Sequence, residues 1–252
     1  VGVSQGAAFG AAFAIIVLGA GVESVTTSSI VNVSNPYLVS GCAFIGAMLS
    51  TVFILVLSRI KKLSHGILVL TGVALGALFS GATTMLEYFA DDVKVAAVVY
   101  WTFGDLGSTY WRDILYTLLI VAAAFLYFYW NRWNYNAIQS GEDTAKSLGV
   151  NTELLLLAGM VVCSLTAAVV ISNVGLISFV GLIAPHMVRK FVGSDYRFLL
   201  PASGLAGAIL LLLSDTVART VVSPVVLPIG AIMSFVGAPV FLIIIFREGQ
   251  RK

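Results

Sequence analysis

Long apolar runs separated by short polar stretches dominate the pattern along this chain. Eight runs are each roughly 20 residues long, and they lie at 5–21, 38–57, 66–88, 113–131, 153–171, 174–191, 198–214 and 227–246. About 20 apolar residues in a helix cross the hydrocarbon core of a bilayer, because each residue rises about 1.5 Å. The pattern therefore predicts eight transmembrane helices.

One shorter apolar run, at 93–103, is too short to cross a bilayer and predicts an interfacial or re-entrant helix. A β-barrel would need alternating strands of about ten residues. The runs here are instead continuously apolar and rich in Ala, Leu, Gly and Val. We therefore expect an all-α, polytopic transmembrane helix bundle.

The composition supports a bilayer as the natural solvent of the chain. Hydrophobic residues make up 59% of the 252 residues and charged residues 10%, whereas soluble domains carry about 25% charged residues. The formal net charge of +2 gives no indication of a nucleic-acid partner. The lipid bilayer is thus the first partner that the sequence predicts.

Lysine and arginine divide unequally between alternate loops. Three lie on one side, namely Lys94, Arg112 and Arg219. The other eleven of the chain's 14 lie on the opposite side: Arg59, Lys61, Lys62, Arg132, Lys146, Arg189, Lys190, Arg197, Arg247, Arg251 and Lys252. Cytoplasmic loops carry the excess of basic residues. The basic side, with the C-terminus, is therefore predicted to be cytoplasmic.

The outer side holds the polar features that have two interpretations. Asp215 and Arg219 lie four residues apart on one helical face, which suits a structural ion pair near the interface or a role in a transport path. Acidic residues also gather in the outer loops. They form either a solvated rim or a docking surface for a basic partner, and they are Glu23, Glu87, Asp91 and Asp92.

The motifs of hydrolytic enzymes and metal sites are missing from the sequence. There is no GxxxxGK[ST], HExxH or GxSxG, so any nucleotide must be hydrolysed by another polypeptide. His186 stands alone in APHMVRK and is expected to pack or to form a hydrogen bond, not to bind a metal. His65, in KKLSHG, lies either at a cytoplasmic constriction or in a simple loop.

A charged decapeptide, GEDTAKSLGV at 141–150, follows the aromatic run LYFYWNRWNY on the cytoplasmic side. Ser140 or Gly141 can start a turn, Glu142 and Asp143 suit a helix N-terminus, and Gly149 can end the helix. Ala145 and Leu148 are expected to share one small apolar face. The residues alone fit either a solvated linker or a helix that docks in a groove of a partner.

Several motifs together resemble the permease subunits of type II ABC importers, the FecCD and cobalamin-permease type. They occur in order along nearly the whole chain: VGVSQGAAFG, GEDTAKSLGV, SFVGLIAPHMVR, the G-D-R-L-LP stretch at 193–201, LLLLSDTVAR and LPIGAIMSFVGAPVF. This family takes up iron–siderophore complexes, haem, cobalamin and, in some members, oxyanions. The resemblance implies a transport function for the chain.

The resemblance also implies how the chain is organised. Family members have about ten spans, and the segment that VGVSQGAAFG resembles follows the first two. We therefore expect residues 1–252 to be one permease domain that is N-terminally incomplete. Within it, residues 132–152 are expected to form the cytoplasmic coupling segment.

The resemblance assigns roles to particular residues. The residues expected to contact the ATPase are Gly141, Glu142, Asp143, Ala145, Leu148 and Gly149. The residues expected to line a cytoplasmic gate are Ser64, His65 and Gly66. The residues of family motifs to which we give structural roles are Pro185, His186, Arg189, Asp215, Arg219, Pro228, Gly230, Gly237 and Pro239.

The resemblance finally implies an assembly in the cell (inner) membrane. Two permease copies would form a homodimer around the translocation path, two ATPase subunits would bind ATP and Mg²⁺, and an extracytoplasmic binding protein would deliver substrate. The chain itself is expected to bind no cofactor. Iron–siderophore is the default substrate, with haem, cobalamin and oxyanions open. The alternative is an ATP-independent secondary transporter or channel.

Overall fold

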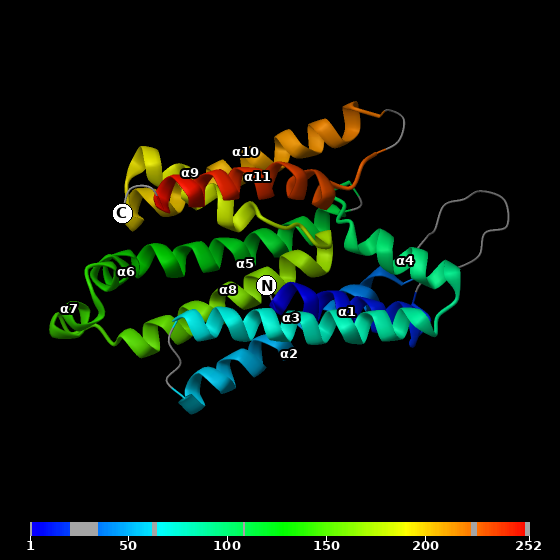
Figure 1. Ribbon diagram of the computed structural model, residues 1–252, viewed down its shortest axis with the longest axis horizontal. Helices are drawn as coiled ribbons and strands as arrows, with labels where there is room; N and C mark the ends of the chain where they lie inside the picture. Colours follow the sequence, from blue (N-terminus) through cyan, green and yellow to red (C-terminus); the bar gives the residue numbers. More distant parts are fainter. Residues whose placement is uncertain (1, 21–34, 62–64, 108, 223–225, 250–252) are drawn as a thin grey trace. The chain divides into compact units, whose positions relative to one another are not determined.

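A computed structural model describes residues 2–20, 35–61, 65–107, 109–222 and 226–249 (Figure 1). Within these ranges the structure is all-helical and contains no strand. The helices are α1 Gly2–Ile16, α2 Pro36–Lys61, α3 His65–Tyr88, α4 Asp92–Thr102, α5 Trp111–Trp130, α6 Arg132–Gln139, α7 Glu142–Ser147, α8 Thr152–Val174, α9 Val180–Val192, α10 Tyr196–Thr220 and α11 Ile229–Gly249. The predicted all-α class is confirmed.

Five helices of the described chain are long and apolar enough to cross a membrane. The five stretches are Pro36–Leu57, Val69–Tyr88, Trp111–Trp130, Thr152–Val174 and Tyr196–Thr220. Two shorter apolar stretches, the whole of α1 (Gly2–Ile16) and the part Ile229–Val240 of α11, lie where two further spans were predicted. The expected count of eight spans is therefore not confirmed.

The predicted span at 174–191 is not one helix. Helix α8 continues to Val174, residues 175–179 are not helical, and α9 has only 13 residues, which extend about 20 Å against a core of about 30 Å. Gly175 and Phe179 have φ angles of 78° and 68°, a left-handed conformation that interrupts a right-handed helix. By contrast, the run at 93–103 is the short helix α4, as its length predicted.

The contacts divide the chain into two compact units. Unit 1 consists of Val1–Thr102, Ser108–Thr117 and Met160–Leu176. Unit 2 consists of Phe103–Gly107, Leu118–Gly159 and Ile177–Lys252.

Close backbone packing of α1 forms the core of unit 1. Helix α1 lies against α2 and α3 (Figure 1), and it buries Ala7, Ala11 and Ala14 completely. A Cβ added to Gly6 would lie 2.6 Å from the carbonyl oxygen of Gly46, closer than any real Cβ contact. Small residues spaced by four allow two membrane helices to approach this closely, so the glycine-rich start of the sequence determines this contact.

Helix α4 also contributes to the core of unit 1. Ala97 and Val98 are buried in the same cluster as the alanines of α1. The ammonium group of Lys94 donates a hydrogen bond of 3.1 Å to the carbonyl oxygen of Ile16, at the end of α1. A lysine at a helix C-terminus satisfies a free carbonyl and interacts favourably with the helix dipole.

Unit 2 is built on α9, α10 and α11, which pack on one another (Figure 1). Ala218, Ile229 and Met233 form its buried cluster. The backbone N–H of Leu227, just before α11, donates a 3.0 Å hydrogen bond to the carbonyl of Ala218 in α10. The hydroxyl of Ser214 lies 2.8 Å from the sulfur of Met233.

Candidate functional site

The predicted coupling segment folds as two short helices of unit 2, α6 and α7. The backbone N–H of Ser140 bonds the carbonyl of Ala137 and that of Gly141 the carbonyl of Ile138, at 3.1 and 3.0 Å, and these bonds close the end of α6. Gly141 then takes φ 123° and ψ 142° as the N-cap of α7. Only glycine adopts such angles at little cost, which explains the position of the turn.

A Schellman motif ends α7 at Gly149. The N–H of Gly149 bonds the carbonyl of Lys146, and the N–H of Val150 bonds the carbonyl of Ala145, both at 3.0 Å. These are the two hydrogen bonds of that motif. Gly149 has φ 83°, which an L-residue with a Cβ adopts only with strain. The predicted roles of Gly141 and Gly149 at the two ends of the helix are therefore confirmed.

The apolar side chains of α7 do not share one exposed face. Ala145 is fully buried, whereas Leu148 is 69% exposed. Other residues of this chain therefore already cover Ala145. The expectation of a common face for Ala145 and Leu148 is wrong, because the C-cap residue Leu148 has left the helical course. Only Leu148 remains available to a partner.

The charges of α7 are arranged around Glu142. Its carboxylate lies 2.9 Å from the ammonium group of Lys146 and accepts a 3.3 Å hydrogen bond from the hydroxyl of Thr152, a buried residue at the start of α8. The hydrogen bond and the charge of Glu142 raise the pKa of Lys146. Asp143 is exposed in the first turn. Glu142 thus fixes α7 to α8 and leaves Asp143 at the surface.

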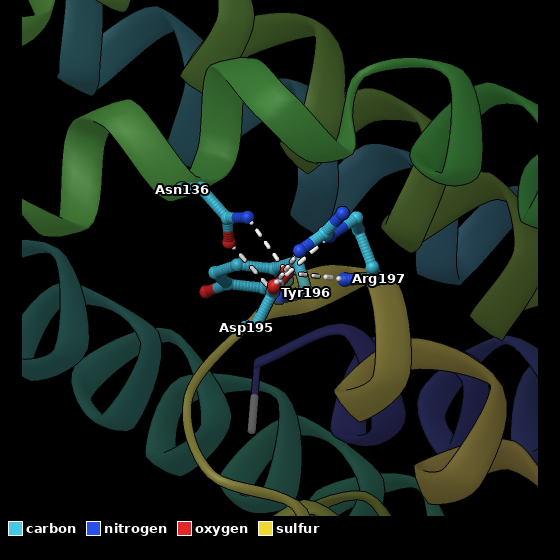
Figure 2. A network of polar contacts seen from close by, with 4 residues as sticks. All are labelled: Asn136, Asp195, Tyr196 and Arg197. Atoms are coloured by element: carbon cyan, nitrogen blue, oxygen red, sulfur yellow. Dashed lines mark hydrogen bonds and ion pairs between the residues drawn. The ribbon is translucent and has the colours of Figure 1, made fainter.

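A polar network joins α6 to the start of α10 (Figure 2). The side-chain amide of Asn136 donates to Asp195 at 2.8 Å and accepts from the backbone N–H of Tyr196 at 2.9 Å. Asp195 also accepts from the backbone N–H and the Nε of Arg197, at 3.0 and 2.9 Å. Asn136 therefore uses both ends of its amide on one short stretch of chain.

The same network holds Asp195 in its ionised form. The side chain of Arg197, the backbone N–H of Arg197 and the amide of Asn136, in that order of importance, lower the pKa of Asp195 to about 2. Each of these donors favours a carboxylate over a carboxylic acid. Asp195 is also the N-cap of α10, where a carboxylate meets the positive end of the helix dipole.

Aromatic side chains surround this network. The ring of Tyr135 lies 5.8 Å from those of Tyr196 and Phe128, and its hydroxyl donates a 3.4 Å hydrogen bond to the carbonyl of Leu155 in α8. The guanidinium of Arg197 lies 4.6 Å from the centre of the Trp133 ring, within the range of a cation–π interaction. Helix α6 is thus bonded to both α8 and α10.

The sequence interpretation missed Asn136, Asp195 and Trp133 as residues of this site. An aspartate directly before an apolar helix is a known capping signal, so the role of Asp195 as N-cap was readable. Asn136 gives no comparable signal, because its partner lies 59 residues away along the chain.

The predicted gate residues remain a prediction. Ser64 lies outside the described residues. His65 and Gly66 begin α3, and their side chains also lie outside the described part.

Asp215 and Arg219 form an ion pair, with Arg219 Nε 2.9 Å from Asp215 Oδ2. Arg219 also lies beside the backbone at Gly107, where an added Cβ would be 3.1 Å from its guanidinium. Asp105 accepts a 2.7 Å hydrogen bond from the N–H of Gly107. The predicted ion pair is therefore formed and lies beside the loop before α5, and its structural role stays a prediction.

The residues predicted on α9 take local roles. A ring nitrogen of His186 lies 2.8 Å from the carbonyl of Leu182, one turn earlier, and Pro185 is inside the same helix. The carbonyl of Arg189 accepts from the N–H of Gly193 and ends α9. A group of three or more His, Cys, Asp or Glu placed to hold a metal ion does not occur in the described ranges.

The remaining motif residues shape the entry and course of α11. The carbonyl of Pro228 accepts from Ile232, and the N–H of Gly230 donates a 3.1 Å hydrogen bond to the carbonyl of Phe103. A Cβ on Gly237 would lie 2.7 Å from the Cβ of Phe179. Pro239 lies within the helix. These residues and the α7 residues thus serve different contacts and do not form one site.

One polar contact inside the apolar helices was not anticipated. In unit 1 the hydroxyl of Tyr116 donates a 2.6 Å hydrogen bond to the side chain of Asn173, which in turn lies 3.3 Å from the hydroxyl of Thr117. Hydrogen bonds of this kind join membrane helices, here α5 and α8. Asp113, one turn before Tyr116, is 9% exposed.

Comparison with known proteins now decides the family. The profile of the FecCD transport family matches residues 1–247. The chain belongs to the FecCD transport family. A protein of Methanocaldococcus jannaschii, named provisionally as an ABC transporter permease, is 48% identical over 251 residues, which are 100% of this chain and 71% of that protein.

Two further similarities cover most of the chain. The hemin transport system permease protein of Yersinia pestis is 36% identical over 215 residues, 83% of this chain and 63% of the relative. A solved structure, described as an inward-facing conformation of a metal-chelate type ABC transporter with that type assigned provisionally, is 27% identical with a TM-score of 0.84. The match covers 98% of this chain and 74% of the other. The chain therefore spans about two thirds of the length of these two curated relatives.

Proposed function

We propose that this chain is the membrane-spanning part of an ATP-driven importer and contributes to the translocation path for a metal chelate. Family membership supports this proposal, and so do the names of its relatives, which include permeases for hemin and vitamin B12. A separate ATPase subunit binds ATP and Mg²⁺ and hydrolyses the nucleotide. Iron–siderophore, haem and cobalamin are the substrate classes that we propose.

The single observation that carries the coupling proposal is the form of the α6–α7 segment. It is a preformed pair of helices, fixed by Asn136 on one side and by Glu142 on the other, with Leu148 69% exposed at its tip. An exposed leucine flanked by solvent-exposed charged side chains is suited to insertion into an apolar groove of a soluble partner. The ATPase is the proposed partner.

The proposed assembly is a homodimer in the cell membrane, with the α6–α7 segment and the C-terminus in the cytoplasm. The excess of basic residues in one set of alternate loops supports this orientation. The contacts are consistent with it, because two loops assigned to that side are joined through Asn136 and Asp195. A binding protein on the opposite side delivers the substrate.

ATPase stimulation tests the proposal. The subunit, expressed with every residue that its gene encodes, is reconstituted in liposomes with the ATPase encoded beside it. We expect Leu148→Asp to lower both co-purification and hydrolysis at least tenfold, because a charge would have to enter the apolar groove without a partner.

The matched control is Phe191→Asp, which places the same charge on another exposed apolar position of unit 2, at the end of α9. We expect this variant to bind and stimulate the ATPase like the wild type. Loss of binding in both variants, or in neither, would contradict the assignment of α7. A wild-type subunit that neither binds nor stimulates the ATPase would leave the ATP-independent transporter as the better function.

A further inference from the structure

We propose that α6–α7 and the α9–α10 hairpin move as one rigid body, and that the contact between Asn136 and Asp195 is the clamp that holds them together. This inference rests on the proposed function: a movement imposed on α7 by an ATPase would reach α10 through the clamp. Asn136 and Asp195 are then positioning residues for transport.

The geometry of Asn136 is the first argument. Its amide nitrogen and its carbonyl oxygen are both used, at 2.8 and 2.9 Å, and both bonds end on adjacent residues of α10 and its cap. Two bonds from one planar amide fix orientation as well as distance, so α6 can neither rotate nor slide along the start of α10 without losing both. The Asp195 bond is charge-assisted and therefore the stronger kind.

The second argument is that the contact is reinforced on the α10 side. Arg197 holds the carboxylate of Asp195 through its Nε at 2.9 Å and also lies over Trp133 of α6. Tyr135 and Tyr196 pack ring against ring across the same junction. Figure 2 shows Asn136 reaching from α6 toward Asp195 and Tyr196, with Arg197 beside them.

The third argument is that α7 is firmly connected to α6. Ala145 is fully buried, and the hydrogen bonds at Gly141 and Gly149 leave little freedom at either end of α7. A force that acts on Leu148 is therefore transmitted from α7 to α6. The clamp then transmits this force from α6 to α10.

Spin labels measure whether the two parts move together. Cysteines are placed at Gln139 in α6 and at Phe191 in α9, both exposed, after Cys42 and Cys163 are replaced by serine. The distance between the labels is measured by double electron–electron resonance in the complete subunit, reconstituted with its ATPase, without nucleotide and with ATP plus vanadate.

In the unsubstituted clamp we expect one narrow distance that nucleotide does not change. In Asn136→Ala we expect a broader distribution that shifts when nucleotide is added, because α6 then moves without α10. Asn134→Ala is the matched control: its amide bonds only Asn131, within the same segment, and should leave the distance narrow. If Asn136 only stabilises the fold, Asn136→Ala should lower the melting temperature, but nucleotide should not shift the distance between the labels.

Asp195→Ser provides a second route if Asn136→Ala folds poorly, because serine still caps α10 but replaces the carboxylate, to which Asn136 and Arg197 both donate, with one uncharged oxygen of shorter reach. We expect the same nucleotide response. A distance that shifts in the unsubstituted clamp, or that stays fixed in both variants, overturns the clamp.

Failure of the proposed function remains distinguishable from failure of the clamp. If the unsubstituted subunit does not bind the ATPase, the function is wrong, and the clamp is judged on the permease alone. In that case a broader distance in Asn136→Ala than in Asn134→Ala supports it, and equal widths overturn it.

Discussion

Helix α1 of unit 1 and helix α6 of unit 2 are held in place by opposite means. Helix α1 has glycine at positions 6 and 10, and at these glycines its backbone is in direct contact with the backbone of α2. Helix α6 instead reaches its neighbours through long polar and aromatic side chains, Asn136 and Tyr135 among them.

The difference teaches where each kind of contact is useful. Backbone contact tolerates no added atom and no displacement, because close-packed interiors yield little. A side-chain network instead fixes one geometry between helices whose backbones lie further apart, with each hydrogen bond contributing about 0.5–1.5 kcal/mol net. The first suits a close-packed core, and the second suits the joining of segments that do not touch backbone to backbone.

The largest effect is expected from Gly46→Ala in the α1–α2 contact. The new Cβ would lie against the carbonyl oxygen of Gly6, and overpacking of this kind costs about 1–3 kcal/mol. Gly41→Ala, one and a half turns earlier in α2, meets open space and should change stability little. Thermal unfolding of the detergent-purified subunit, followed by tryptophan fluorescence, measures the melting temperature of each variant. Equal melting temperatures for Gly46→Ala and Gly41→Ala would show that the backbone contact between α1 and α2 does not contribute to stability.

An intermediate effect is expected from Gly237→Ala in unit 2. Its Cβ would lie 2.7 and 2.8 Å from side-chain atoms of Phe179 and Ile183. Side chains give way more readily than the backbone that Gly46 faces, so we expect a cost in the lower part of the range of about 1–3 kcal/mol. Gly204→Ala in α10 meets open space and is the control.

The double variant Gly237→Ala, Phe179→Gly tests the cause of this cost. Glycine removes the obstructing side chain and also accepts the φ of 68° that Phe179 adopts with strain. The double variant should therefore lose less stability than the sum of the two single variants. If the losses of stability in the two single variants add up to the loss in the double variant, the side chains at 237 and 179 do not clash.

The smallest effect is expected from pH at the clamp. The pKa of Asp195 is lowered to about 2 by Arg197 and Asn136, below an ordinary value of about 3.9. Its contribution to stability is thus fully present above about pH 4 and is lost as the pH falls toward 2. The melting temperatures of wild type and Asp195→Asn should differ at neutral pH and converge in acid. Exposure to solvent keeps this difference small.

Local properties of the sequence determined a substantial part of this protein. Apolar runs predicted helices at every position where a long helix occurs, because a helix satisfies its own backbone in a medium without water. Glycines at 141 and 149 predicted the limits of α7, because positive φ is a property of the residue and its neighbours. The ordered motifs predicted the family that the profile match then confirmed.

Only the tertiary structure decided the rest. Hydropathy separated α8 from α9 but placed the break at 172–173, because the true break at 175–179 is itself largely apolar, and a Cβ on Gly237 of α11 would lie 2.7 Å from Phe179. Periodicity placed Ala145 and Leu148 together, yet tertiary packing buries the first and leaves the second exposed. The clamp joins residues 59 positions apart. Such contacts depend on how the chain returns upon itself, which no local pattern of residues records.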